Sequence, residues 1–311
     1  MKIVTEYGGE YQDMINSYYN LEQYNDNSET EVLFQGYATS INDSLKEQHK
    51  HYDKRIYLNL EAPCAYCSTT TCNDEQEYFS HVYTLCPYTA EWMNKTSKTK
   101  FIPIPFPFNK NSFEHLNYNL PKTNDVMYMG HLLGEEHFRI IDIMRDYKYV
   151  FSAVDGNYPS PYQPTHSNIH SSLKWELLAK SKVSIAMNLA PINETHFQFI
   201  KQYPNWEKNQ AFKNLESRYI PQFKPRVIES MMCKTLVLVK YDEWNVIENW
   251  FTPNQHFIYW HNLEDLYYKI YHIVNNHNMY TPIVHAAYEK VQEYEINEIY
   301  KKIINHEHRT I

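Results

Sequence analysis

The sequence predicts an α/β protein made of two successive units, each containing a parallel β-sheet. Short apolar runs alternate with helix-compatible segments along the chain, an alternation typical of parallel sheets joined by helices. The pattern stops at a polar, irregular linker from about residue 109 to 124 and then starts again. A length of 311 residues also suits about two domains.

In the first unit, the chain begins with a short apolar segment that ends before Gly8-Gly9. Strands are expected at residues 1–6, 31–37, 55–60 and 79–86. Helices are expected at 10–23, 42–51 and 88–94. The segment 101–108, FIPIPFPF, should be extended, because proline disfavours the helical conformation in the residue before it.

In the second unit, the same alternation continues almost to the end of the chain. Strands are expected at 126–129, 149–154, 183–189, 235–239 and 256–259. Helices are expected at 135–147, 171–180, 225–232, 244–250, 263–275 and from 282 onward. A long loop with several prolines should occupy residues 155–170.

Composition and charge exclude some classes of function. The formal net charge is -8, whereas a protein that grips long nucleic acid usually carries a basic face. We see neither a signal peptide nor a run of about 18 apolar residues, so we expect a soluble, cytoplasmic protein with at most peripheral membrane association.

The five cysteines are an odd number, which favours reduced thiols in a protein without a signal peptide. The spacing of Cys64, Cys67 and Cys72, with Cys86 further on, is compatible with zinc ligands. A second C-x-x-C pair is missing, so we favour buried or loop thiols and expect no metal site.

The stretch from 223 to 241, FKPRVIESMMCKTLVLVKY, is the most informative part of the chain. Pro225 suits the first turn of a helix, and the unbroken apolar run 235–239 suits a strand covered on both faces. Glu229 is an acid near the end of this helix, beside the sheet. Ligands of open α/β sheets bind at the carboxyl ends of strands and at neighbouring helix starts, so function is expected here.

The run ESMMCKTLVL, residues 229–238, resembles the E-A-M-A-C-G-T-P-V-V run of GT-B-fold glycosyltransferases, in their donor-binding C-terminal domain (families 1 and 4). The segment 250–266, WFTPNQHFIYWHNLEDL, is also similar to that family. The resemblance covers about residues 125–275 and is only architectural over the N-terminal half.

The resemblance implies two Rossmann-like domains that face each other across a cleft. Residues 1–120 would form an acceptor-binding domain and residues 121–290 a nucleotide-sugar-binding domain. The helix at 291–311 would cross back and pack on the N-terminal domain.

The implied reaction moves a sugar from a nucleotide-diphosphate sugar to a hydroxyl of a glycan or other acceptor. We expect no metal and no further cofactor, because no Asp-x-Asp stands at a strand end and cationic side chains can neutralise the leaving diphosphate. Two alternatives remain open: a non-catalytic sugar- or nucleotide-binding protein of the same fold, and a sugar-nucleotide epimerase.

The resemblance implies that Glu229 holds the ribose hydroxyls of the donor. A carboxylate can accept hydrogen bonds from two neighbouring hydroxyls, although a helix-surface glutamate is the plainer alternative. Two positions depart from the family. Lys234 replaces a common glycine, and Pro221 stands where many retaining members carry a second glutamate, so retention or inversion stays open.

A diphosphate needs cationic or N–H partners, and Arg226 and Lys182 are the best candidates. Gly130 would allow close approach of a phosphate, and His131 could donate to it. Asn188, on a presumed buried strand, either faces the base or pairs internally. Surface charges and locally satisfied polar groups are the alternatives for all of these.

An inverting transfer needs a general base on the acceptor side. Our choice is Glu61, at the carboxyl end of a predicted strand, with Glu10 and Asp13 as runners-up. A loop-capping role is the alternative for Glu61.

Overall fold

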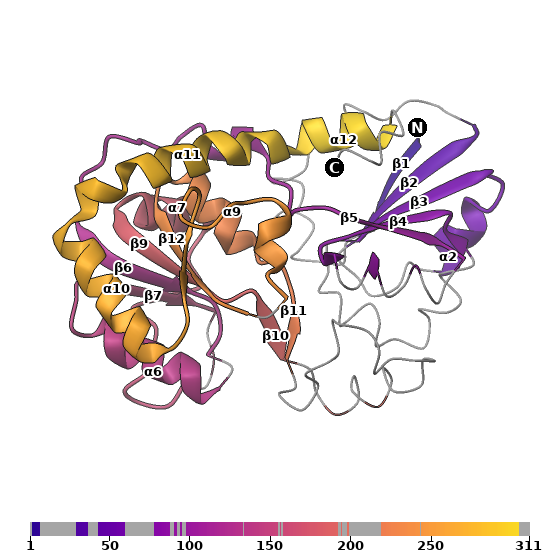
Figure 1. The fold of residues 1–311 in the computed structure, drawn as a ribbon. Coiled ribbons are helices and arrows are strands. Elements are labelled where there is room, and N and C mark those ends of the chain that lie inside the picture. Colours follow the sequence, from indigo (N-terminus) through magenta and orange to yellow (C-terminus); the bar gives the residue numbers. More distant parts are fainter. Residues whose placement is uncertain are drawn as a thin grey trace. The chain divides into compact units, whose positions relative to one another are not determined.

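The computed structural model describes residues 2–6, 29–36, 43–59, 78–87, 90–91, 94, 98–132, 134–154, 156, 158–191, 194, 198, 219–242 and 244–304. The chain divides into two compact units (Figure 1). The first contains Met1–Asn109, Leu189–Phe223 and Tyr294–Ile311, and the second contains Lys110–Asn188 and Lys224–Glu293. The sequence-based division, at residues 120 and 290, grouped 189–223 with the second domain instead, because local patterning carries no record of such distant contacts.

The first unit is built on a five-stranded parallel sheet whose strands follow one another in chain order. The strands are β1 (Lys2–Glu6), β2 (Glu31–Gly36), β3 (Lys54–Asn59), β4 (His81–Thr84) and β5 (Lys100–Pro103). Helix α2 (Asp43–Gln48) connects β2 to β3. The strands therefore agree with the predicted ones, whereas the predicted helix 10–23 lies outside the described residues.

The second unit is built on a six-stranded parallel sheet with the order β13-β12-β9-β6-β7-β8. Its strands are β6 (Asn124–Met129), β7 (Tyr149–Ala153), β8 (His166–Ser167), β9 (Ser181–Ala186), β12 (Leu236–Lys240) and β13 (Ile258–Trp260). Its helices are α6 (Glu135–Met144), α7 (Ser171–Ala179), α9 (Pro225–Met232), α10 (Leu263–Asn275) and α11 (Thr281–Val291).

The helices of the second unit form two layers, one on each face of the sheet (Figure 1). Helices α6 and α10 pack together on one face, and α9 packs against α7 and α11 on the other. Alternate residues of the strands point to the two layers, as the pleat of a strand requires. Ser184 of β9, for example, accepts a hydrogen bond from Ser230 of α9 at 2.9 Å, while its neighbour Ile185 enters the core beneath α6 and α10.

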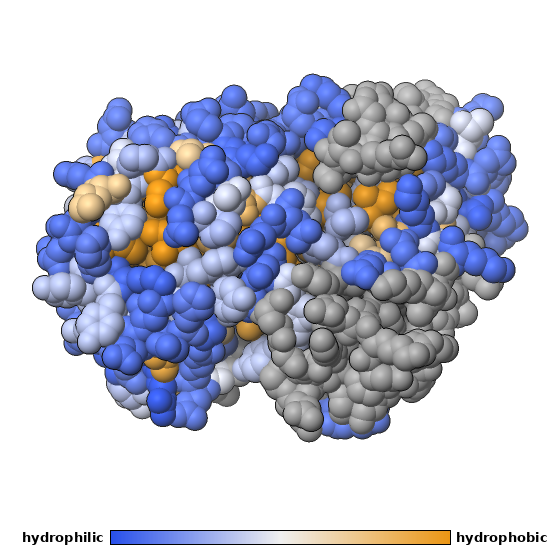
Figure 2. Space-filling view, in the orientation of Figure 1, coloured by the Kyte–Doolittle hydropathy of each residue, from blue (hydrophilic) through white to orange (hydrophobic). Residues whose placement is uncertain are grey.

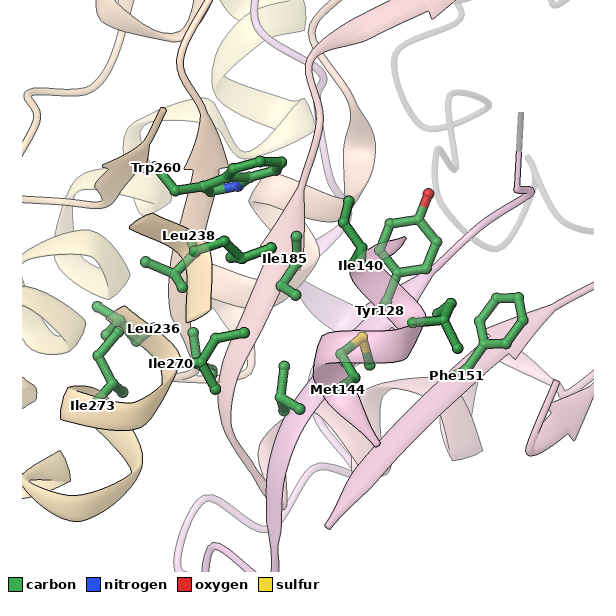
Figure 3. Packing of buried hydrophobic residues seen from close by; sticks show 14 of the residues in the cluster. Tyr128, Ile140, Met144, Phe151, Ile185, Leu236, Leu238, Trp260, Ile270 and Ile273 are labelled. Carbon is green, nitrogen blue, oxygen red and sulfur yellow. The ribbon is translucent and has the colours of Figure 1, made fainter. Parts of the chain in front are cut away.

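The core on the α6 and α10 side is aliphatic and aromatic, and Figure 3 shows its side chains converging from strands and helices. Ile140 and Met144 of α6 meet Ile270 and Ile273 of α10 over the sheet. Burying each such side chain contributes about 1.5–3 kcal/mol before the entropy of folding is counted. Figure 2 shows that the visible face of this unit is, by contrast, mostly hydrophilic.

Several elements differ from the predictions. The helix predicted at 244–250 is a short 3-10 turn, η6 (Val246–Asn249), because Asn245 before it adopts a left-handed conformation with φ 49°. Strand β13 lies slightly later than the predicted 256–259. A small antiparallel pair, β10 (Leu189–Pro191) with β11 (Tyr219–Pro221), was not predicted, since three-residue strands have no readable period.

The last helix, α12 (Ile296–Ile304), belongs to the first unit. The chain re-enters that unit at Glu295, which bridges to Phe108, and the Ile296 N–H donates to the Phe108 carbonyl at 2.8 Å. In the part of the chain that the structure describes, we find no helix with the length and apolarity needed to cross a bilayer.

Lys234 occupies the turn between α9 and β12 in a left-handed conformation, with φ 51°. This geometry explains why glycine suits the position, since other residues are strained there. Here cation–π contacts offset the strain of the lysine: its ammonium lies 4.9 Å from the ring centroid of Tyr118 and 4.4 Å from that of Tyr288. Its carbonyl accepts a hydrogen bond from Lys122 at 2.8 Å.

We expect Lys234→Ala to lower the free energy of unfolding by about 1–2 kcal/mol, because two cation–π contacts of roughly 0.5–1 kcal/mol each are lost. Lys234→Gly should be less destabilised than Lys234→Ala, since glycine also removes the left-handed strain of about 1–2 kcal/mol. Urea unfolding measures both variants, with the exposed Lys301→Ala as a control. Equal stability of Lys234→Ala and the unsubstituted protein would contradict the role of the two rings.

Candidate functional site

The candidate site lies at the carboxyl edge of the six-stranded sheet, where the order of the strands reverses. We call this part of the sheet the switch edge. Strand β6 connects through α6 to β7 on one side, whereas the neighbouring β9 connects to β12 on the other. Such a reversal leaves a crevice outside the strand ends, and ligands of open α/β sheets bind there. The five described strands of the first unit run in chain order and contain no reversal.

Gly130, directly after β6, provides space at this edge for the side chain of Arg226. A Cβ atom on Gly130 would lie 2.4 Å from Nη2 of Arg226, and Gly130 has a φ of 118°, which other residues rarely adopt. Arg226 comes from the first turn of α9, on the opposite helix layer, and its guanidinium reaches over the end of β6. The glycine and the arginine are therefore fitted to each other.

Tyr128 of β6 supports the same guanidinium. The Arg226 guanidinium lies 5.8 Å from the centroid of the Tyr128 ring and hydrogen-bonds its hydroxyl. The hydroxyl in turn donates to the His131 carbonyl at 3.2 Å. Burial raises the pKa of Tyr128, and Arg226 opposes that shift, so the phenol is neutral and leaves the charge of Arg226 uncompensated.

His137, in the first turn of α6, borders this cluster. It is 6% exposed, and its ring meets the Tyr128 ring edge-on at 6.0 Å between centroids. Its Nδ1 has no hydrogen-bond partner among the described residues. Burial, and then the nearby Arg226, lower the pKa of His137 to about 4, so its imidazole is neutral at ordinary pH.

Glu229 lies one turn further along α9 and is 7% exposed. Its Oε1 accepts a hydrogen bond from Nζ of Lys174 at 2.5 Å, an ion pair that links α9 to α7. Sequence reasoning missed Lys174, since only packing of the two helices reveals it. A buried carboxylate needs such a partner, because an unpaired charge is costly away from water.

Asn188, two residues after the end of β9, is fully buried, and its Oδ1 accepts a hydrogen bond from the N–H of Lys224 at 3.2 Å. Lys224 precedes the first turn of α9, so Asn188 fastens the start of that helix to the sheet edge. The Nδ2 of Asn188 has no partner among the described residues. A buried donor without a partner costs about 1–3 kcal/mol, which makes a polar ligand at this position favourable.

Comparison with known proteins shows the family of the chain. The family model described as glycosyl transferase-like matches residues 142–305, more than half of the chain. The chain belongs to this glycosyl transferase-like family. No curated protein matches the sequence significantly.

Solved structures of glycosyltransferases share the fold. HepE from Anabaena, in complex with UDP and glucose, has a TM-score of 0.59 and 11% identity, covering 98% of each chain. TarM from S. aureus has a TM-score of 0.55 and 13% identity, covering 92% of this chain and 56% of its own. Sucrose-phosphate synthase from Thermosynechococcus elongatus has a TM-score of 0.51 and 11% identity, covering 88% of this chain and 74% of its own.

These matches establish the GT-B fold that the resemblance implied, with two parallel sheets and helices. The chain spans little more than half the length of TarM. The fold and the family are thus known, while the donor and acceptor of this chain are matters for proposal.

The structure brings together five of the residues that the sequence singled out: Gly130, His131, Asn188, Arg226 and Glu229 all lie at the switch edge or on the first two turns of α9 beside it. The exposed His131 turns to Tyr158, whose hydroxyl lies 2.9 Å from its Nδ1. His131 therefore contributes its backbone carbonyl to the Arg226 support through Tyr128, a role that sequence reasoning did not foresee.

Lys182 lies apart from this group. It is the second residue of β9, at the amino edge of the sheet, where its ammonium pairs with Asp125 at 2.7 Å and donates to the Val274 carbonyl at 3.2 Å. In a parallel sheet the two edges are separated by the length of the strands, so Lys182 does not reach the switch edge. A residue at the start of a parallel strand lies at the amino edge, whereas ligands of open α/β sheets bind at the carboxyl edge.

The predicted catalytic base, Glu61, lies outside the described residues, as do Cys64, Cys67 and Cys72. Cys86 and Cys233 are described, and both are buried. Within the described ranges, no group of three or more His, Cys, Asp or Glu side chains could hold a metal ion.

We expect Gly130→Ala to weaken anion binding at this edge because the new methyl group would occupy the position of the Arg226 guanidinium. The strained backbone should also lower the free energy of unfolding by about 1–3 kcal/mol. A double-mutant cycle with Arg226→Ala, read by urea unfolding and by calorimetry, separates the two effects. In the Arg226→Ala background the steric part disappears, so additive effects of the two substitutions would contradict the fit between these residues.

Proposed function

We propose that this protein is a glycosyltransferase that moves a sugar from a nucleotide-diphosphate sugar to a hydroxyl of a glycan or other acceptor. The donor binds at the switch edge of the second unit. The observation that carries this proposal is the uncompensated guanidinium of Arg226 at that edge, supported by the family match and by the UDP complexes of the structural relatives.

Most neighbouring cations in the second unit are already neutralised. Lys174 pairs with Glu229, and Lys240, at the end of β12, pairs with Glu136 at 2.6 Å. Among the described residues, Arg226 has no carboxylate partner within ion-pair distance. An arginine held against a neutral phenol is suited to a phosphate group of a diphosphate, which it can grip with two parallel hydrogen bonds.

Glu229 is the proposed ribose ligand. Its carboxylate is held by Lys174, and a carboxylate offers about four acceptor positions on its two oxygens. One turn of α9 separates Arg226 from Glu229, a rise of about 5 Å along the helix axis. That separation suits a ligand in which a diphosphate is joined to a ribose, with the phosphate nearer the helix start.

The acceptor and the general base are assigned to the first unit. Glu61, after β3, is our choice of base from the sequence pattern, and it would remove the proton from the acceptor hydroxyl in an inverting transfer. Arg226 would neutralise charge that develops on the departing diphosphate, so the transfer needs no metal ion at this position.

We expect Arg226→Gln to weaken binding of a nucleoside diphosphate by about 10- to 100-fold, because charge-assisted hydrogen bonds of roughly 1.5–3 kcal/mol are lost. Glu229→Gln should weaken binding of the nucleoside diphosphate while leaving the affinity for inorganic phosphate unchanged, since only the ribose contact is altered. Calorimetry with UDP, GDP, ADP and phosphate measures these affinities.

Lys182→Gln is the matched control, because it removes a cation of the same sheet at the opposite edge. Its affinity for the nucleotides should match that of the unsubstituted protein. Binding that is lost in Lys182→Gln and retained in Arg226→Gln would reject the proposed donor site.

Transfer itself is tested by donor hydrolysis and by transfer to glycan acceptors with a panel of nucleotide sugars. Release of nucleoside diphosphate that depends on Arg226 supports the glycosyltransferase. Tight binding without any turnover across the panel would instead favour a non-catalytic sugar-nucleotide-binding protein.

A further inference from the structure

His137 stands out among the buried polar groups of the second unit, because the proposed roles of Arg226 and Glu229 leave it unexplained. It is a histidine in the first turn of a ten-residue helix, α6, whose N-terminal Gly134 offers no side chain as a cap. The helix start therefore presents backbone N–H groups and the positive end of the helix dipole to the switch edge. A buried imidazole nitrogen without a partner at the same place is a second, independent sign of a missing polar ligand.

The charges around His137 come from three elements. Arg226 from α9 and Lys224 before α9 disfavour a positive imidazole, whereas Glu136 of α6 favours one. The fourth neighbour, Tyr128 of β6, is neutral and in ring contact. Glu136 is itself held by Lys240 at 2.6 Å, so its effect on the imidazole is partly cancelled.

We propose that His137 is a further anion-binding residue of the donor site, whose imidazole takes up a proton from solvent when the donor phosphate arrives beside Arg226. This inference rests on the proposed function, because it needs a phosphate at Arg226. The proton comes from water, and no bond in the ligand is broken.

The sign of the effect follows from the electrostatics. In the free protein, burial and Arg226 hold the pKa of His137 at about 4, so the ring is neutral at pH 6. A bound phosphate neutralises Arg226 and adds negative charge beside the imidazole, which raises the pKa of His137. Binding is then coupled to proton uptake below the raised pKa and is uncoupled well above it. If the bound ring titrates near pH 7, uptake strengthens binding at pH 6 by about tenfold.

Calorimetry of UDP, GDP and ADP binding at pH 6.0 and 8.0, in two buffers of different ionisation enthalpy, measures the uptake. At pH 6.0 we expect the unsubstituted protein to take up a substantial fraction of a proton more than His137→Gln, and to bind about tenfold more tightly. At pH 8.0 the difference in proton uptake should vanish. Protonation of the nucleotide phosphate itself contributes equally to both proteins and is removed by the comparison.

His277→Gln is the matched control. His277 is also buried in part, its Nε2 also has no partner among the described residues, and burial together with Lys122 lowers its pKa. It belongs to η7 (His277–Tyr280), after the end of α10 and near Lys182 at the amino edge of the sheet. Proton uptake and affinity in His277→Gln should equal those of the unsubstituted protein.

A second substitution, His137→Phe, keeps a ring against Tyr128 if glutamine disturbs packing. If both variants fail to fold, NMR titration of the histidine rings in the unsubstituted protein decides: one low pKa should rise above 6 when the best-binding nucleotide is added. Equal proton uptake in the unsubstituted protein and the folded variant, or no histidine pKa that moves, overturns the role of His137. Absence of binding to all three nucleotides overturns the proposed function and the inference with it.

Discussion

The candidate site of this protein depends on one interaction, the placement of the Arg226 guanidinium over the backbone of Gly130. The arginine begins on the helix layer formed by α7, α9 and α11, crosses the end of β6, and meets Tyr128 and His137 from the other layer. Only a residue without a side chain leaves room for it. One arginine thereby connects the two faces of the sheet at the point where the strand order reverses, and its charge remains available to a ligand.

The titratable side chains of Tyr128 and His137, which surround this arginine, are uncharged. Burial keeps the proton on Tyr128 and keeps the imidazole of His137 uncharged. Acids at the same edge are held by other cations, Glu229 by Lys174 and Glu136 by Lys240. Among the described residues, Arg226 is thus left without a carboxylate partner beside these buried neutral groups, where its attraction for an anion is stronger than it would be in bulk water.

The turn after α9 shows how a departure from family pattern is accommodated. A left-handed lysine is more strained than glycine, but Lys234 gains contacts with Tyr118 and Tyr288 and a hydrogen bond from Lys122. These contacts lie at the amino edge of the sheet, away from the switch edge. The substitution at this turn therefore concerns stability, and it leaves the geometry of Arg226 and Glu229 to the other end of α9.

Local patterning in the sequence was sufficient to identify most strands and helices and the parallel sheets. Apolar runs such as 235–239 can be recognised in the sequence because a strand covered on both faces must be apolar throughout. Glu229 can be recognised as an acid close to such a run. The short elements η6 and β10 were not predicted, because a left-handed asparagine and a three-residue strand leave no periodic signal.

Only the tertiary structure decided which charged side chains come into contact. In the folded protein, Lys174 pairs with Glu229 and His137 lies near Arg226, whereas Lys182 lies at the opposite edge of the sheet. The reason is that these contacts join residues 55 to 89 positions apart in the chain, and their partners are set by strand order and helix packing, which no local pattern encodes.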